Sequence, residues 1–366
     1  MNKIEEVFEQ VIPLKVSKEE KEKIVKKITQ KYKAVTNSKF KFIDLFAGVG
    51  GLRTGFDQNG GECVFSSEWD KYAQMTYFAN FGEIPHGDIT KVALADIPKH
   101  DILLAGFPCQ AFSIAGERKG FEDTRGTLFF DVARILESKK PSAFLLENVK
   151  GLLSHEKGKT FQVIIETLKE LNYEVFHNVM NTMDYANVPQ TRERLYIVGF
   201  LKSKVKKIDF DFPKKKKLTK TIAEVLEHGK QDDYFYYNRF DIYENLKKEM
   251  KKMDTVYQWR RVYVRENKSN VCPTLTANMG TGGHNVPLVK DAFGIRKLTP
   301  RECARFQGFP ETFHIPGFLA NSHLYKQFGN SVSVPVIKLI AEKMVETLES
   351  NKSLSATNKK SQEISM

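Results

Sequence analysis

Short apolar runs alternate with helix-like stretches between residues 40 and 200, and this alternation constrains the fold more than any other feature. Six runs have the length and composition of buried strands: 41–46, 64–67, 101–104, 143–146, 175–179 and 195–200. Helical patterns lie between them over 51–59, 72–81, 127–138 and 160–171. Strands that alternate with helices predict an α/β fold, a mainly parallel doubly wound sheet covered on both faces. Ligands of such sheets bind beyond the carboxyl ends of the strands.

The alternation ends after Phe200, and the rest of the chain divides accordingly. Residues 37–200 form the predicted large domain, and residues 201–296 are basic, aromatic and irregular, which predicts a smaller separate module. Residues 297–348 return to a regular pattern that ends in an apolar helix from Val334. Residues 1–36 predict an accessory helix with a capping box of Ser17 and Glu20, and residues 349–366 a flexible polar tail.

Positive charge is concentrated in the predicted small module. The chain has 57 Lys and Arg against 45 Asp and Glu, a net charge of +12. Residues 201–290 contain 20 basic and 11 acidic side chains, so this quarter of the chain carries a surplus of 9. A basic module suits phosphate contacts, although a solvated Lys-rich surface is the alternative. No apolar run approaches the about 18 residues of a membrane span, and no apolar signal segment follows Met1, so we expect a cytoplasmic protein without a membrane partner.

Four cysteines occur, at positions 63, 109, 272 and 303, without a C-x-x-C pair. This spacing predicts neither a disulfide framework nor a structural metal site, and we expect no metal.

A strand leads into a glycine turn and then a helix in Phe42-Ile-Asp-Leu-Phe-Ala-Gly-Val-Gly-Gly-Leu52. The spacing of Gly48 and Gly50 is G-x-G-G, which differs from the dinucleotide pattern G-x-G-x-x-G. Asp44 before the turn would repel a pyrophosphate. A ligand with a positive centre and no phosphate, such as S-adenosylmethionine, fits this turn better.

Further polar and aromatic residues follow the next extended segments. Glu68 ends the second strand and is placed to accept hydrogen bonds from ribose hydroxyls, and Trp69 offers a flat face for adenine. Asp88 follows a third segment and could accept from the adenine amino group. For each residue taken alone, a tight turn or a helix cap is the alternative.

Cys109 lies in a Pro-containing loop after the 101–104 strand, where active-site residues collect. Glu147 ends the next strand at the same predicted sheet edge. Arg192 and Arg194 enter a later strand one residue apart, so they are expected to point the same way, and such an Arg can hold Glu147. A buried inert thiol and a structural ion pair are the alternatives.

The ordered segments FIDLFAGVGG, SSEWD, GDIT, GFPCQAFS, FLLENVKG, QTRERLYIVGF, RKLTPRECARFQGFP and YKQFGNSVSVPV resemble the DNA (cytosine-5) methyltransferases, particularly the bacterial modification enzymes. The resemblance covers about residues 40–200 and 295–340. It implies a Rossmann-like S-adenosylmethionine-dependent methyltransferase domain with a β-rich target-recognition domain. It also implies that the final helix packs beside the first glycine turn.

The resemblance implies covalent catalysis on cytosine. Cys109 would add to carbon 6, Glu147 would stabilise the proton on ring nitrogen 3, and Arg194 would hold Glu147 and the carbonyl oxygen. Residues implied for the cofactor pocket are Asp44, Phe46, Gly48, Gly50, Glu68, Trp69, Asp88, Ile89, Pro108, Leu128, Asn330 and Ser331. Residues expected to contact DNA are Ser113, Arg260, Arg261, Arg265, Thr274 and Leu275.

The expected partner is double-stranded DNA, which a monomer would methylate at carbon 5 of cytosine in a short specific sequence, and a cognate restriction endonuclease is functionally linked. A tRNA cytosine-5 methyltransferase is one alternative, but its typical Cys-Phe-Thr element is missing, and Cys272-Pro273-Thr274 is the nearest analogue. A non-catalytic DNA-binding regulator is another, although Cys109, Glu147 and Asn330 are all retained.

Overall fold

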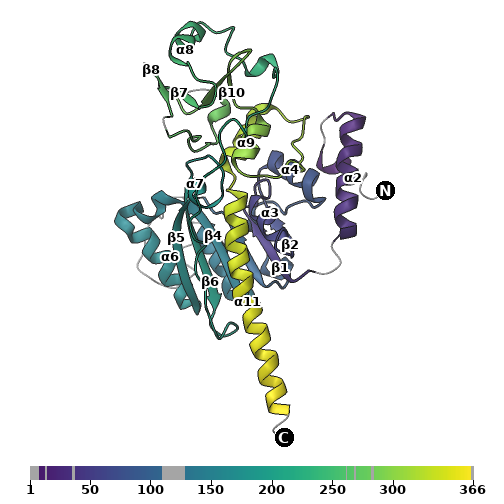
Figure 1. Ribbon diagram of the computed structural model, residues 1–366. Helices are drawn as coiled ribbons and strands as arrows, with labels where there is room; N and C mark the ends of the chain where they lie inside the picture. The colour runs from purple at the N-terminus through teal and green to yellow at the C-terminus, as the bar shows by residue number, and fades with distance from the viewer. Residues whose placement is uncertain are drawn as a thin grey trace.

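The computed structural model describes residues 8–12, 15–34, 38–108, 128–260, 262–267, 269–281 and 284–363. Figure 1 shows a large α/β part and, above it, a smaller part built mainly from the segment around β7 to β10. The C-terminal helix α11 (Val334–Glu363) runs along the large sheet and projects beyond it. The N-terminal helix α2 (Lys18–Ala34) lies against the side of the large part.

The large part contains a six-stranded sheet. Its strands are β1 (Phe40–Leu45), β2 (Gly61–Ser67), β3 (Ile102–Ala105), β4 (Ala143–Val149), β5 (Tyr173–Asn181) and β6 (Glu193–Leu201). Their order is β2-β1-β3-β4-β6-β5, and β6 runs antiparallel to both of its neighbours. The prediction of a mainly parallel α/β sheet is therefore confirmed, with one reversed strand.

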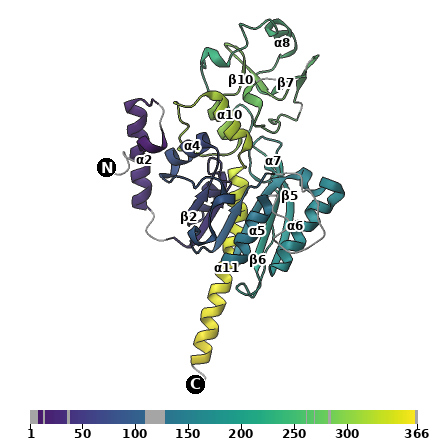
Figure 2. The ribbon, with the colours of Figure 1, turned by 180° about the vertical axis from the view of Figure 1, so that it is seen from behind.

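The two faces of this sheet build two separate cores. In β4, Ala143 and Leu145 face a core that includes α3 (Gly51–Asp57) and α11. Phe144 and Leu146 alternate with them and face a core that includes α5 (Leu128–Lys139) and α6 (Lys159–Glu170). Figure 2 shows α5 and α6 on the face opposite to α11. Strands buried on both faces explain why the strand segments are continuous apolar runs.

Helix α11 packs against α3 at unusually short range. A Cβ atom at Gly55 would lie 2.6 Å from Cγ2 of Ile337, and one at Gly51 would lie 2.8 Å from Cγ2 of Val332. Gly51 and Gly55 are one helical turn apart, so they present one smooth face to the returning chain. The expectation that the final helix returns beside the first glycine turn is confirmed. Helix α11 continues to Glu363, beyond its predicted end near residue 348.

The small part contains a four-stranded antiparallel sheet of order β10-β9-β7-β8. The strands are β7 (Tyr257–Arg260), β8 (Tyr263–Glu266), β9 (Pro287–Asp291) and β10 (Gly294–Lys297), and α8 (Tyr243–Glu249) packs beside them. Val205 and Phe210 belong instead to the core around α11, because this early stretch runs along the large domain. The small module therefore begins later in the chain than the predicted residue 201.

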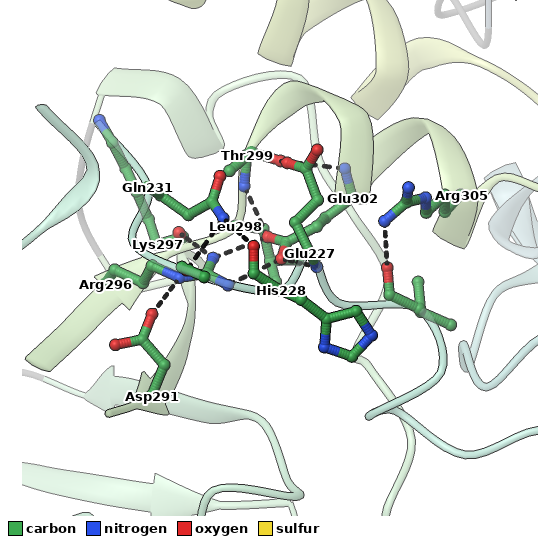
Figure 3. A network of polar contacts seen from close by, with 12 residues as sticks. Glu227, His228, Gln231, Asp291, Arg296, Lys297, Leu298, Thr299, Glu302 and Arg305 are labelled. Carbon is green, nitrogen blue, oxygen red and sulfur yellow. Dashed lines mark hydrogen bonds and ion pairs between the residues drawn. The ribbon is translucent and has the colours of Figure 1, made fainter. Parts of the chain in front are cut away.

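A buried ion-pair network joins the two parts, and Figure 3 shows its side chains. Arg296 of β10 is 1% exposed and forms two hydrogen bonds of 2.8 Å to the carboxylate of Glu302 in α9 (Pro300–Phe306). Its Nε lies 2.7 Å from Asp291 of β9. Glu302 also completes a capping box with Thr299. The small sheet is thus tied to the start of the returning segment.

The N-terminal extension is packed into the large part. Ile24 and Ile28 of α2 are fully buried in a core shared with α4 (Lys71–Phe81) and α10 (Asn321–Asn330). The Ser17 hydroxyl accepts from the Glu20 amide at 3.3 Å, as predicted for a cap. The Glu20 carboxylate accepts from the Gly317 amide at 2.7 Å, so it is used for docking the helix.

Candidate active site

Glu147 and Arg194 meet at the carboxyl end of β4. Because β6 is antiparallel to β4, the start of β6 lies beside the end of β4, and Val149 pairs with Arg194. The Nε of Arg194 lies 3.1 Å from Oε1 of Glu147, and both side chains are largely buried. The predicted contact between these two residues is confirmed.

The other oxygen of Glu147 faces the loop that leads to Cys109. A Cβ atom at Gly106 would lie 3.7 Å from Oε2 of Glu147. The neighbouring Asn148 is 3% exposed, and its Nδ2 donates to the Phe107 carbonyl at 2.8 Å. These contacts hold the described end of the loop beside the carboxyl group. Cys109 and Ser113 lie outside the described residues, and Pro108, the last residue before them, is exposed.

Burial dominates the electrostatics of Glu147. It raises the pKa of this carboxyl, while Arg194 and, less strongly, Arg192 lower it. A carboxyl with a raised pKa retains its proton more readily, as a group that donates a hydrogen bond to a ring nitrogen requires.

Cysteines 63, 272 and 303 are buried free thiols. Burial raises the pKa of Cys63 to about 12 and the pKa values of Cys272 and Cys303 well above their usual range. A thiol that does not ionise is a poor nucleophile. These three buried cysteines therefore have structural roles, and Cys109 is the remaining cysteine of the sequence.

Arg192 does not share the contact of Arg194. It precedes β6, is 2% exposed, and donates to the carbonyls of Leu275 at 3.0 Å, Gly329 at 3.3 Å, and Ser331. Burial and the nearby Arg194 lower its pKa to about 9. Arg192 therefore ties the recognition segment to the returning chain. The prediction that both arginines point the same way is wrong. Arg194 contacts Glu147 and Arg192 contacts backbone carbonyls, because only Arg194 lies within the strand.

A buried carboxyl group lies under the glycine turn. Asp44 is fully buried in β1, and neither of its oxygens accepts a hydrogen bond of ordinary geometry from the described residues. Burial raises the pKa of Asp44 well above its usual range, although Arg53 at the start of α3 opposes this. Gly48 has a φ of 54°, and an added Cβ there would meet no atom within 4 Å. Gly50 has a φ of 83°, so both glycines adopt the left-handed backbone that other residues rarely take.

Glu68 and Trp69 lie beside this turn. Oε2 of Glu68 accepts from the Gly48 amide at 2.7 Å, and burial raises the pKa of Glu68. Trp69 is 81% exposed, which leaves its ring face available. Asp88 caps a short 3-10 helix by accepting from the amide and hydroxyl of Thr90, and these hydrogen bonds lower its pKa.

The other predicted cofactor residues surround the same turn or lie close to it along the chain. Phe46 has a φ of 54° directly before the turn, and Ile89 is buried behind Asp88. Ser331 meets the turn through its Oγ, which a Cβ at Gly51 would approach to 2.8 Å. Asn330 ends α10 with an exposed side chain, and Leu128 begins α5. The buried Asp44 carboxyl, the open space at Gly48 and the exposed Trp69 indole fit a cationic, phosphate-free nucleoside.

The predicted DNA contacts separate into two groups. Arg260 and Arg265 lie on the β7–β8 hairpin, and the guanidinium of Arg260 donates to Gln258 at 3.0 Å and to Asn285 at 3.2 Å. Arg261 lies outside the described residues.

Thr274 and Leu275 are used internally. The Thr274 hydroxyl donates to the Thr191 carbonyl at 2.7 Å, and the Leu275 side chain is fully buried. The predicted DNA contact by Leu275 is therefore corrected to a packing role beside Arg192.

This fold and site define a Rossmann-like methyltransferase. A family model described as C-5 cytosine-specific DNA methylase matches residues 40–346. The chain belongs to this family, as the sequence predicted, and it is a DNA (cytosine-5) methyltransferase.

Curated relatives agree with this assignment. The chain is 53% identical over 310 residues to the type II methyltransferase M.Bsp6I of Bacillus sp. (strain RFL6), covering 83% of this chain and 98% of that relative. It is 48% identical over 325 residues to M.SsoII of Shigella sonnei, covering 88% and 84%. The relation to bacterial type II methyltransferases is confirmed.

Solved structures share the fold at low identity. The S. pombe Dnmt2 methyltransferase aligns with a TM-score of 0.66 at 20% identity, covering 85% of this chain and 99% of that structure. A prophage-encoded putative DNA modification methyltransferase of E. coli aligns with a TM-score of 0.60 at 21% identity, covering 84% and 99%. The family match and the closer curated relatives support the DNA enzyme over the tRNA alternative.

Within the described part of the chain, no three His, Cys, Asp or Glu side chains are grouped to hold a metal ion. The helices of this part include none that is both long and apolar enough to cross a bilayer.

Proposed function

We propose that this enzyme methylates one cytosine within a specific short double-stranded DNA sequence and thereby protects host DNA from a cognate restriction endonuclease. The observation that carries the proposal is the Glu147–Arg194 pair at the sheet edge, beside the loop that continues into Cys109. The relatives named as type II methyltransferases supply the biological setting.

Cys109 and Glu147 act on the target ring together. The thiolate of Cys109 forms a bond to carbon 6, and Glu147 provides the proton that ring nitrogen 3 takes up. The electron pair released toward carbon 5 makes that carbon nucleophilic. After the methyl group is attached, water takes the carbon 5 proton, and the electron pair of that C–H bond restores the 5,6 double bond. The bond to sulfur breaks and releases the Cys109 thiolate, and nitrogen 3 returns its proton to Glu147. This covalent route divides one difficult step into easier ones.

The cofactor residues proposed from the sequence hold the methyl donor beside this edge. S-adenosylmethionine supplies, when bound, the methyl group that carbon 5 accepts. Asp44 offers a buried carboxyl group, and a bound cationic centre favours its ionised form. Glu68 accepts from ribose hydroxyls, and Trp69 stacks on adenine. Asp88 accepts from the adenine amino group. No metal is required for these contacts.

The recognition module binds DNA while the target base leaves the stack. Unstacking a base costs a few kcal/mol. The surplus of basic residues between 201 and 290 can offset this cost through phosphate contacts. Arg260 and Arg265 are proposed to contact DNA, and the amide groups of Gln258 and Asn285 hold Arg260 in a fixed orientation.

The experiment follows radiolabelled methyl groups from S-adenosylmethionine into plasmid DNA and maps the product by bisulfite sequencing. Cys109→Ala is expected to abolish labelling, and a fluorinated cytosine in the mapped site should trap the wild-type enzyme covalently. Glu147→Gln keeps the size but cannot supply a proton, so kcat should fall about 10²- to 10⁴-fold.

The matched control is Glu193→Gln. Glu193 is next to Arg194 in β6, but its carboxylate is exposed and pairs with Lys150. Its replacement should leave kcat within about twofold. Full activity of Cys109→Ala would refute the nucleophile assignment.

We further propose a monomer that acts in the bacterial cytoplasm on nucleoid DNA.

A further inference from the structure

A cavity of about 360 Å³ lies within the small module, between its sheet and the segment before α8. This is within the range of roughly 300–1,000 Å³ typical of small-ligand sites. We call this cavity the recognition pocket. Its lining includes Tyr234, Tyr237, Arg239, Phe240, Trp259 and Lys297.

Aromatic rings of this pocket remain partly uncovered. Phe240 is 46% exposed and Tyr234 is 39% exposed. The rings of Tyr237 and Phe240 lie with centroids 5.4 Å apart. Exposed aromatic faces bind nucleobases by stacking, whatever the base.

Two cations lie over these rings. The Nζ of Lys297 is 3.9 Å from the centroid of Tyr234, and the guanidinium of Arg239 is 5.2 Å from that of Phe240. Neither cation forms an ion pair with a carboxylate among the described residues; Asp233, close by in sequence, pairs with Lys230 at 2.9 Å. Aromatic faces combined with available positive charge suit a base that carries a phosphate.

The pocket adjoins the elements that we propose to contact DNA. Trp259 directly precedes Arg260 in the β7–β8 hairpin. Gly280, another lining residue, belongs to the short helix η6 (Met279–Thr281). A ligand of this pocket would therefore lie next to the recognised DNA.

We propose that the recognition pocket receives a nucleobase of the bound DNA other than the methylated cytosine. The base stacks on the exposed ring of Phe240, and the ring of Tyr237, tilted by 59° to that of Phe240, meets the edge of the base. Arg239 and Lys297 contact its phosphate. When the target cytosine leaves the duplex, its guanine loses its partner, and an unpaired base is the one that costs least to displace. This inference rests on the proposed function, because it requires a duplex whose target base is flipped.

The test measures affinity for a set of duplexes that contain the mapped site, each lacking one base other than the target. Phe240→Ala should weaken binding to the intact duplex about 10-fold, the size of one lost stacking contact. On the duplex that lacks the occupant base, the same substitution should have no effect. Equal weakening on every duplex, or none on the intact one, would overturn the proposal.

Phe293→Ala is the matched control, because Phe293 is a 47% exposed aromatic in the turn between β9 and β10 that does not line the pocket. It should leave the affinity for each duplex unchanged. A second readout does not depend on a variant: 5-iodouracil placed at single positions should photo-crosslink to Tyr237 or Phe240. Crosslinks found only outside the pocket would contradict the proposal.

Free 5′-dGMP distinguishes a DNA base from a loose nucleotide. DNA is rejected as the source of the occupant if this nucleotide binds saturably and Phe240→Ala weakens binding equally on every abasic duplex. Methyl transfer is measured in parallel. If the wild-type enzyme methylates cytosine but no duplex position is coupled to Phe240, only the pocket proposal is rejected. If the wild-type enzyme does not methylate cytosine, the proposed function itself is rejected.

Discussion

Asp44 shows how a single residue can be kept at a cost to the free protein. Its buried carboxyl lacks a hydrogen-bond partner among the described residues. Such a group costs about 1–3 kcal/mol, and more if it is charged. The position under the glycine turn is therefore explained by ligand binding better than by stability.

The stability of the protein should depend on pH through Asp44. Because the pKa of this group is raised in the folded state, the folded protein binds a proton that the unfolded chain releases above about pH 4. The free energy of unfolding should then fall as pH rises, by up to about 1.4 kcal/mol per pH unit, until the folded pKa is passed.

Asp44→Asn removes this dependence. In urea unfolding between pH 4 and 8, the free energy of unfolding of the variant should rise relative to that of the wild type as pH rises. The variant should also bind S-adenosylmethionine more weakly than the wild type. A constant difference between the two proteins across this range would contradict the assignment.

Residues at strand ends could be predicted from the sequence, whereas residues between strands could not. Glu147 was expected at the sheet edge because it follows an apolar run, and it lies there. Arg192 was expected to share the direction of Arg194, but β6 begins only at Glu193. The close approach of Gly106 to Glu147 and the hydrogen bond from Asn148 to the loop left no signal in the spacing, because both depend on tertiary packing.

Among the elements, α3 and α11 meet through glycines. A Cβ atom placed on Gly55 would lie 2.6 Å from Cγ2 of Ile337. The sequence predicted both helices and the resemblance predicted their contact. The sequence pattern did not predict the reversal of β6, because the direction of a strand is set by its connections and not by its composition. That reversal is what places Arg194 next to Glu147.

Gly55→Ala should separate these helices. Overpacking of this kind costs about 1–3 kcal/mol, to be measured as a loss in the free energy of unfolding. Adding Ile337→Ala removes the closest atom, Cγ2 at 2.6 Å, and leaves the Ile337 Cβ at 2.9 Å and the Lys338 amide nitrogen at 3.0 Å. The double variant should therefore show less than the sum of the two single losses. Gly151→Ala, where an added Cβ meets nothing within 4 Å, serves as the control and should stay within about 0.5 kcal/mol.

At the scale of the whole molecule, the two domains are joined by buried charge. Arg296 and Glu302 are 1% and 0% exposed, and they link the small sheet to α9. Removing one partner of such a pair leaves the other charged and unpaired, which costs about 3–5 kcal/mol. The network in Figure 3 thus fixes the recognition module to the catalytic domain.

Arg296→Met is expected to lower the free energy of unfolding by about 3–5 kcal/mol, as measured with urea. Under conditions where the variant remains folded, DNA affinity should fall more than affinity for S-adenosylmethionine, because the module loses its fixed position. Lys23→Met is the control, since Lys23 and its partner Glu19 are 65% and 78% exposed, and such a pair should contribute about 0–1 kcal/mol. Equal losses in the two variants would show that the buried pair has no special role.

The contact of α11 with α3 also has a consequence for how the protein is made. Helix α3 leaves the ribosome before the recognition module, and its partner α11 leaves after that module. On that side of β1, β3 and β4, the part of the apolar core that α11 supplies is missing until then. A nascent chain interrupted before residue 334 would therefore expose the part of this surface that α11 covers, so the catalytic domain is completed only after the recognition module has been synthesised.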